Sequence, residues 1–456
     1  MKNLIALSLC ILSISLSGQV KYDCYSKAEI EQDLDFAFGK LTNIHPIFLD
    51  STQLNQWQDK YSSIKSSLKD SMTQNECYLI LASLFASLND GHTGVVMPYD
   101  QRVQYSNAGG KAFPFFVDIE NNSMYVSFYC GNDSTLLKGG EQILEINSIE
   151  VTTMVHEMQK LYGGNSVVNK NHEIADKFRF LIWMLYGFEN DYEILIKNNQ
   201  NNIQKIPVPG ITSIEFKENL KRKPKEIDKQ FDVSINNQNK TAILKIKSFG
   251  DLDGFCAFAN KAFADINENN IENLVIDIRN NSGGRSIVVD SLMNYITGKE
   301  YAQYKKIEMR VSKELKEWYE KRYPERLNWI NGFANDELVI SEQEPIQPKN
   351  NNLTFKGNLY LLTNKTSFSA AATFAGVFKE LKLGTIIGEE TGGTIAYYGD
   401  YWFLTTPNTG IKFHVAPKRF IQYGGTLHNR GVIPNNIVSD IGDSIINFTY
   451  GLIEKQ

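Results

Sequence analysis

The sequence predicts a multidomain α/β protein with an N-terminal helical domain, a small, mostly β domain and an α/β core. Its 456 residues exceed the length of one ordinary core, so two or three domains are expected. Near the start of the chain, apolar residues recur at helical spacing. In the middle, they form short β-like runs. Strand and helix patterns then alternate through the second half.

The first residues, 1–18, fit a secretory signal peptide. One early lysine precedes the apolar run Leu4–Leu16, and small residues end the run. A membrane anchor would need roughly 20 apolar residues, more than this run offers. Cys10 lies inside the run, which leaves lipid attachment as the lesser alternative. We therefore expect a periplasmic or secreted protein with no membrane span in the mature chain.

Charge and cysteine content exclude several classes of protein. The net charge of −5 is modest and both signs are dispersed, so nucleic acid is not an expected partner. The cysteines after the signal include no C-x-x-C pair, so neither a zinc site nor a redox motif is predicted. Export would permit a disulfide, and the pairing stays open. These four residues are Cys24, Cys77, Cys130 and Cys256.

Residues 22–105 are predicted to form the helical domain. Capping-box patterns begin at Ser26 and at Thr73, each followed three residues later by glutamate. After the second box, apolar side chains share one helical face. The predicted helix ends at Asn89–Gly91, and His92 comes directly after it.

Residues 110–210 are predicted to form the β domain, in which short strands surround one helical stretch. Its last residues, Pro207–Gly210, are expected to be a linker because proline and glycine favour loops. The expected strands are Phe113–Val117, Met124–Phe128, Gln142–Ile146 and Tyr192–Ile196.

Residues 213–445 alternate strands with amphipathic helices, which predicts βαβ units. An insertion at 300–352 breaks this rhythm; it is charged, aromatic and helix-prone over Lys313–Tyr323, and we expect a lid or an interface there. The expected strands are Ala242–Ile246, Leu274–Ile278, Leu359–Leu362 and Thr385–Ile387, and the expected helices are Phe255–Ile266, Ile287–Ile296 and Ala370–Leu381.

Three segments of the chain could carry chemistry. A strand runs into Gly283–Gly284 before a helix, where free backbone N–H groups suit a developing oxyanion, although ordinary turns also use glycine. Ser369 begins a helix, either as a nucleophile or as a plain N-cap. His92, in a glycine-flanked turn, is either a general base or a loop residue without a special role. No metal site is implied.

Together, these segments resemble the serine peptidases of the C-terminal processing peptidase and tricorn-core family, in the family's order. This resemblance implies a PDZ-like domain at 110–210 and a ClpP/crotonase-like α/β peptidase core at 213–445. The matching motifs are Asp90–Thr93; Gly139–Asn147, similar to G-x-x-I-L-x-I-N-G with Ser148 for the last glycine; Asp277–Gly284, similar to D-L-R-N-N-x-G-G; Ser367–Ala371; and Gly388–Gly393, similar to G-E-x-T-x-G.

The resemblance implies that Ser369 is the nucleophile. Backbone N–H groups of Gly283, Gly284 and Ala370 would then bind the oxyanion. The processing branch activates its serine with a lysine just after G-E-x-T-x-G, and Thr394 stands at that place here. A serine–lysine dyad is therefore not expected.

The tricorn-core branch uses a histidine that matches His92, which is therefore the expected base. Two residues depart from that branch: Gly91 replaces its serine before the histidine, and His428 stands where it has a glutamate. His428 is therefore the residue predicted to be the third catalytic group. Asp90, two residues before the base, is a possible substitute for the glutamate.

Hydrolysis of peptides or unfolded protein tails through an acyl-enzyme is the expected activity, with no cofactor. The PDZ-like domain would bind an extended peptide by strand addition. The missing lysine and glutamate leave a catalytically impaired peptide-binding protein as the alternative, and an esterase as a weaker one. The natural substrate and the oligomeric state stay open.

Overall fold

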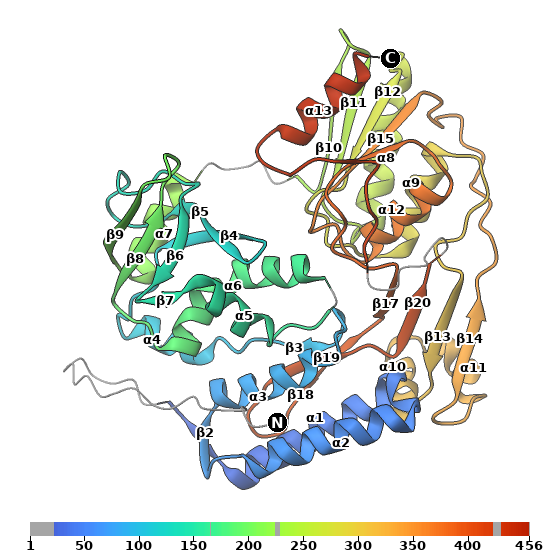
Figure 1. Ribbon diagram of the computed structural model, residues 1–456. Helices are drawn as coiled ribbons and strands as arrows, with labels where there is room; N and C mark the ends of the chain where they lie inside the picture. The colour runs from blue at the N-terminus through green and yellow to red at the C-terminus, as the bar shows by residue number, and fades with distance from the viewer. Residues whose placement is uncertain (1–21, 165, 224–228, 423–429, 456) are drawn as a thin grey trace.

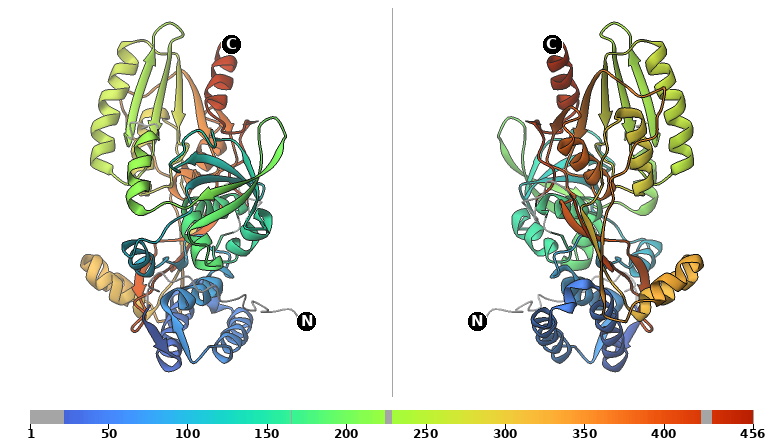
Figure 2. Two further views of the ribbon diagram at one scale, coloured as in Figure 1. Left: turned by 90° about the vertical axis from the view of Figure 1, so that its left-hand side faces the viewer. Right: turned by 90° about the vertical axis from the view of Figure 1, so that its right-hand side faces the viewer.

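The computed structural model describes residues 22–164, 166–223, 229–422 and 430–455. The expected signal peptide and His428 both lie outside these residues. The N-terminal helices and the α/β core lie at opposite ends of the molecule, as Figure 1 and Figure 2 show. Within the described ranges, no helix is long and apolar enough to cross a bilayer. The four cysteines after residue 22 are all free thiols.

Three helices dominate the N-terminal part, and both predicted capping boxes are confirmed. The Ser26 and Thr73 hydroxyls accept hydrogen bonds from the backbone N–H of Glu29 and Glu76, whose carboxylates accept bonds in return. The elements are β1 (Cys24–Ser26), α1 (Lys27–Ile44), η1 (Pro46–Leu49), α2 (Ser51–Ser66), β2 (Ser71–Thr73) and α3 (Gln74–Ala86). Helix α3 ends slightly earlier than predicted, and the turn after it passes through Asn89 at φ 55°.

The β domain is an antiparallel sheet in the order β4-β5-β6-β8-β9, with β7 paired to β6. The sequence predicted one helical stretch between the strands; the structure has two there, α5 and α6, with Gly163 and Gly164 between them. The elements are α4 (Asp100–Asn107), β4 (Phe115–Glu120), β5 (Ser123–Tyr129), β6 (Gln142–Ile146), β7 (Ile149–Glu150), α5 (Val151–Gln159), α6 (Val167–Tyr186), β8 (Asp191–Lys197) and β9 (Ile203–Pro209).

The prediction of a linker at Pro207–Gly210 is wrong. Strand β9 continues through Pro209, and Pro207 and Pro209 pair with residues of β8. Strand β9 is an edge strand. Proline lacks a backbone N–H and is tolerated at an edge, so this proline-rich stretch extends the sheet. The chain then passes through α7 (Ser213–Asn219) and η2 (Leu220–Arg222).

The core is a mixed sheet in the order β10-β11-β12-β15-β16-β21, parallel except for β10. Buried side chains of α8, α9 and α12 pack on one face and those of α13 on the other, which confirms the α/β core. The elements are β10 (Phe231–Asn236), β11 (Thr241–Ile246), α8 (Leu252–Glu268), β12 (Asn273–Asp277), α9 (Ser286–Ile296), β15 (Asn358–Thr363), α12 (Ala370–Glu380), β16 (Thr385–Gly388), β21 (Asn436–Ile437) and α13 (Ser444–Ile453).

The insertion at 300–352 joins the core to the N-terminal helices. Its strands enter a second sheet in the order β14-β13-β20-β17, and Glu314 forms an ion pair with Lys40 of α1 at 3.0 Å. Residues 300–352 therefore form an interface, one of the two roles expected for them. The elements are β13 (Lys306–Arg310), α10 (Lys313–Arg322), η3 (Pro324–Arg326), α11 (Leu327–Asn331), β14 (Leu338–Glu342), β17 (Ala396–Gly399) and β20 (Lys418–Ile421).

A three-stranded sheet connects residues from the two ends of the chain. Strand β3 (Gly94–Val95), just after His92, pairs with β19 (Lys412–Val415), which pairs with β18 (Trp402–Thr405). The hydroxyl of Thr93 also accepts a hydrogen bond from the backbone N–H of Ala416 at 3.1 Å. This sheet carries the His92 turn toward the core.

Candidate active site

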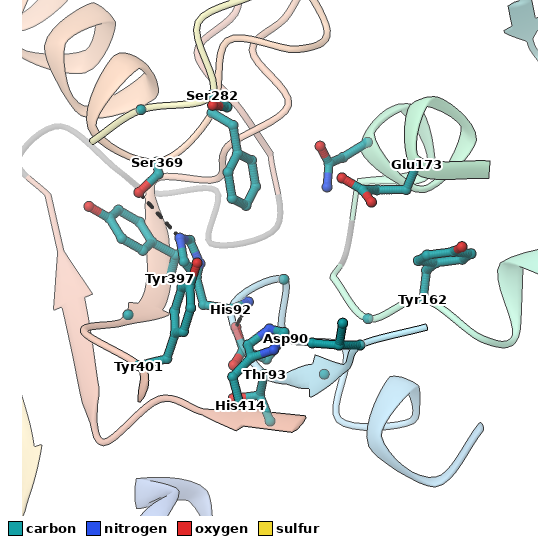
Figure 3. Close-up of a pocket in the computed structure, with 18 of the residues that line it drawn as sticks. Asp90, His92, Thr93, Tyr162, Glu173, Ser282, Ser369, Tyr397, Tyr401 and His414 are labelled. Carbon is teal, nitrogen blue, oxygen red and sulfur yellow. Dashed lines mark hydrogen bonds between the residues drawn. The ribbon is translucent and has the colours of Figure 1, made fainter. Parts of the chain in front are cut away.

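Ser369 lies between strand β15 and helix α12, at the carboxyl edge of the core sheet. Its backbone has φ 51° and ψ −123°, a region that non-glycine residues rarely adopt. Ser369 occupies the N-cap position of α12, but its hydroxyl makes no capping bond. Instead, Oγ lies 3.2 Å from Nε2 of His92, 277 residues away in the sequence (Figure 3). The hydroxyl is thus committed to the histidine and not to the helix.

The turn after α3 fixes the backbone of His92. One oxygen of the Asp90 carboxylate, Oδ1, accepts a hydrogen bond from the His92 backbone N–H at 3.0 Å. On the far side of His92, the pairing of β3 with β19 continues the chain. The backbone of His92 is thus fixed by the Asp90 hydrogen bond before it and by the β3–β19 pairing after it.

Burial keeps His92 in its neutral form. The residue is 7% exposed, and burial lowers the pKa of its imidazole, although the nearby carboxylates of Asp90 and Asp400 act in the opposite direction. A neutral imidazole that accepts the Ser369 proton at Nε2 carries its own proton on Nδ1. Among the described residues, no acceptor bonds that Nδ1. Nε2 of His92 is well placed to act as the base, but Nδ1 has no carboxylate partner among the residues that the structure describes.

The second oxygen of the Asp90 carboxylate faces a different histidine, His45. Oδ2 of Asp90 lies 3.5 Å from Nε2 of His45, and both side chains are buried. The His45 Nδ1 accepts a hydrogen bond from the backbone N–H of Ile47, so the His45 proton is on Nε2 and faces Asp90. Although burial acts to raise it, the pKa of the Asp90 carboxyl is lowered, because His45, His92 and Thr93 favour the charged form. Asp90 therefore supports the turn and does not bond the His92 ring.

A glycine turn packs against the nucleophile. At Gly283, φ is 103°, and a Cβ there would lie 2.7 Å from the Ser369 Cβ and 2.9 Å from the Ala370 nitrogen. The Gly283 N–H donates to Asn281 Oδ1 at 2.8 Å, so it is not free for an oxyanion. In the described structure, no acceptor bonds the N–H groups of Gly284 and Ala370. These two remain as donors beside Ser369.

Asparagines tie this turn to the loop of the nucleophile. The Asn280 backbone N–H donates to Asn364 Oδ1 at 3.0 Å, and the Asn364 amide donates back to Asn280 Oδ1 at 2.9 Å. The Phe368 N–H also donates to the Asn281 carbonyl at 3.0 Å. This accounts for the D-x-R-N-N pattern before the two glycines: its amides hold the glycine turn and Ser369 at a fixed separation.

A cavity of about 1100 Å³ opens in front of the Ser369–His92 pair. Across it from Ser369 lie Tyr162 and Glu173 of the β domain (Figure 3). Glu173 is paired with Lys177 of α6. The nucleophile therefore faces a space whose opposite wall belongs to another domain, and ligand sites are often found at such domain interfaces.

Sequence reasoning missed several aromatic and histidine side chains that surround His92. Tyr397, Tyr401 and His414 line the cavity, and none of them lies in a motif that pointed to chemistry. Phe368 belongs to the predicted nucleophile segment Ser367–Ala371, and its place directly before Ser369 is the one signal that points to it. Of the predicted residues, the structure brings Ser369, His92, Gly283, Gly284 and Ala370 together. The Gly283 N–H, predicted as an oxyanion donor, is bonded to Asn281 instead.

The chain is similar to known peptidases. Residues 240–438 match the family model Peptidase family S41. A structure of mature CPAF complexed with lactacystin is 17% identical and has a TM-score of 0.66, with 94% of this chain and 97% of that chain covered. A structure of mature CPAF alone is 15% identical and has a TM-score of 0.65, with 94% of this chain and 96% of that chain covered. The photosystem II D1 C-terminal processing protease is 14% identical with a TM-score of 0.48, and 90% of this chain and 93% of that chain are covered. The expected family resemblance is confirmed.

Proposed function

We propose that this chain, a serine-type peptidase whose core is that of family S41, hydrolyses peptides or unfolded protein tails through an acyl-enzyme on Ser369. The observation that carries the proposal is the 3.2 Å contact between Ser369 Oγ and His92 Nε2, made by a hydroxyl that does not cap its own helix. His92 acts as general base because burial keeps its imidazole neutral.

Each step of the reaction has a group in place. His92 Nε2 takes the Ser369 proton as Oγ bonds to the scissile carbonyl carbon, and the displaced electron pair moves to the carbonyl oxygen. The Gly284 and Ala370 N–H groups bind that oxygen. As the C–N bond breaks, His92 returns the proton to the leaving amine. A water molecule then releases the acyl group by the same route.

The β domain serves as a PDZ-like peptide-binding domain. Strand β4 is an edge strand of its sheet, and helix α6 packs beside it. An extended peptide can add to such an edge through main-chain hydrogen bonds. The end of β4 lies close to the nucleophile loop, because Glu120 forms an ion pair with Lys365 at 3.4 Å. A peptide bound along β4 is thereby directed toward the cavity at Ser369.

A serine-directed fluorophosphonate tests the nucleophile. The wild-type protein should be labelled on Ser369, and Ser369→Ala should be neither labelled nor active on a fluorogenic peptide. Turnover of simple esters without cleavage of matched peptides would favour an esterase. An unlabelled wild type would contradict the proposal and favour the peptide-binding alternative. That alternative is supported by the His92 Nδ1, which lacks a carboxylate partner among the described residues.

Export to the periplasm or the medium completes the proposal. It rests on the apolar run Leu4–Leu16 and the small residues that follow it. Cleavage after residue 18 can be checked by intact-mass measurement of the protein from an expressing bacterium. A mass that includes residues 1–18 would contradict export by a cleaved signal.

A further inference from the structure

Two aromatic rings stack on the imidazole of His92. The Phe368 ring lies 4.9 Å away between centroids, at an interplanar angle of 21°, and the Tyr397 ring lies 5.3 Å away at 25°. We call these two residues the aromatic pair. A third ring, Tyr401, is farther, at 6.1 Å, and is tilted by 48°. The imidazole plane is therefore set by stacking.

Both members of the aromatic pair are positioned relative to the nucleophile. Phe368 is the residue before Ser369. The Tyr397 hydroxyl lies 3.1 Å from the Thr373 hydroxyl and 3.0 Å from that of Tyr304. Thr373 is on helix α12 and donates to the Ser369 carbonyl at 3.3 Å. Any movement of the rings is thus resisted by the same helix that presents Ser369.

Gly91 makes room for this arrangement. A Cβ at this position would lie 3.1 Å from Cζ of Phe368, tighter than most contacts of a real Cβ. The glycine before the histidine therefore permits the Phe368 ring to lie against the turn that carries His92. The departure of this residue from the tricorn-core pattern has a structural consequence at the base.

Among the described residues, the charged groups around His92 do not bond its Nδ1. The Asp90 carboxylate, on the same turn, is used by the His92 backbone and faces His45. Asp400, after β17, has a side chain 49% exposed and is paired with Lys418 of β20. His414 of β19 is neutral above acidic pH, because burial lowers its pKa to about 4. Two of the rings near the imidazole, those of Tyr397 and Tyr401, are phenols.

We propose that Phe368 and Tyr397 are positioning residues that orient the His92 imidazole and stabilise the imidazolium formed during attack on the substrate. Aromatic faces attract a cation through their quadrupole, so stacked rings favour protonated over neutral imidazole. In a serine–histidine–aspartate triad, a carboxylate does both tasks. This inference rests on the proposed role of His92 as the base.

The test compares a ring with an aliphatic side chain at the same place. The pKa of His92 is followed by NMR of imidazole-labelled protein in a Ser369→Ala background, so this measurement needs no hydrolysis. Tyr397→Leu and Phe368→Leu should each lower that pKa by about one pH unit, the scale of a desolvated cation–π contact. Tyr397→Phe keeps the ring and should stay near wild type. Tyr401→Leu, with its tilted and more distant ring, is the matched control and should shift the pKa less.

Kinetics in the Ser369 protein supply the second measurement. Tyr397→Leu and Phe368→Leu should lower kcat by about tenfold with little change in KM, and should move the acid limb of the pH profile to lower pH. If Tyr397→Leu fails to fold, Tyr397→Met keeps similar bulk without a ring. An unchanged or raised pKa in the leucine or methionine variants, or an equal loss in Tyr397→Phe, would overturn the proposal. Shifted pKa values in a protein without hydrolysis would reject the proposed function and leave the aromatic pair intact.

Discussion

The substitution Gly283→Ala examines the oxyanion site directly. At this position φ is 103°, and the added Cβ would lie 2.7 Å from the Ser369 Cβ, 2.8 Å from the Phe368 carbonyl oxygen and 2.9 Å from the Ala370 nitrogen. Two of these three atoms are backbone, so no side-chain rotation relieves the contact. The methyl group would displace the nucleophile loop or cover the Ala370 N–H.

The expected loss follows from one missing oxyanion donor. Removing a single donor typically costs about 10²–10³-fold in kcat, about 2.7–4 kcal/mol of barrier. The backbone at positive φ adds a separate stability cost of about 1–3 kcal/mol. Gly109→Ala controls for that second cost, because Gly109 has φ 86° and open space around its Cβ position.

The assay is kcat/KM on one fluorogenic peptide, with thermal unfolding measured on the same preparations. Gly283→Ala should lose at least 10²-fold in kcat/KM, whereas Gly109→Ala should lose stability and keep its activity. Fluorophosphonate labelling should slow in parallel with kcat/KM. A Gly283→Ala protein that is folded and cleaves the peptide at the wild-type rate would refute the assignment of the Ala370 N–H to the oxyanion.

Three further predictions follow from the ionisable groups around the turn. Because burial lowers the pKa of His92 below 6.5 and the base acts when neutral, kcat/KM should rise with pH and reach half its maximum below pH 6.5; a midpoint above 7 would contradict a buried neutral base. Asp90→Asn keeps the acceptor for the His92 N–H but turns an NH₂ group toward the proton on His45. The variant should lose about 1–3 kcal/mol of stability and some activity, and unchanged thermal unfolding would contradict this expectation. Burial lowers the pKa of His414 from 6.5 in the unfolded chain to about 4 in the folded protein, so the free energy of unfolding should fall by about 3 kcal/mol between pH 7 and pH 4. In urea unfolding measurements, His414→Phe should lack most of this loss.

The core and its loops could be predicted because their signals are local. Strands β12 and β15 are short apolar runs, each followed by a loop that begins with or contains asparagine, and Ser369 stands directly before an amphipathic helix. The capping boxes of α1 and α3 are equally local, since serine or threonine and glutamate stand three residues apart. Prediction worked where one short window held the determining interactions.

Long-range pairing defeated the same reasoning. Strand β9 contains two prolines and was expected to be a linker, because only the sheet order reveals that it lies at an edge. The stacking of Tyr397 on His92 joins residues about 300 positions apart, and no periodicity relates them. Position 428 poses a different difficulty, since the resemblance placed a catalytic group there and the described residues do not include it.

The position of His92 depends on contacts from every part of the molecule. The loop between α5 and α6 packs so closely on the histidine turn that a Cβ at Gly163 would lie 2.2 Å from the Asp90 carbonyl oxygen. Strand β19, from late in the chain, pairs with β3 just after the base, and Phe368 of the core stacks on the imidazole. Burial of the imidazole, which keeps it neutral, is a product of these contacts together. The described residues of the core include the nucleophile and the oxyanion donors but no histidine within reach of Ser369. The general base is therefore in place only when the N-terminal helices, the β domain and the core are packed together.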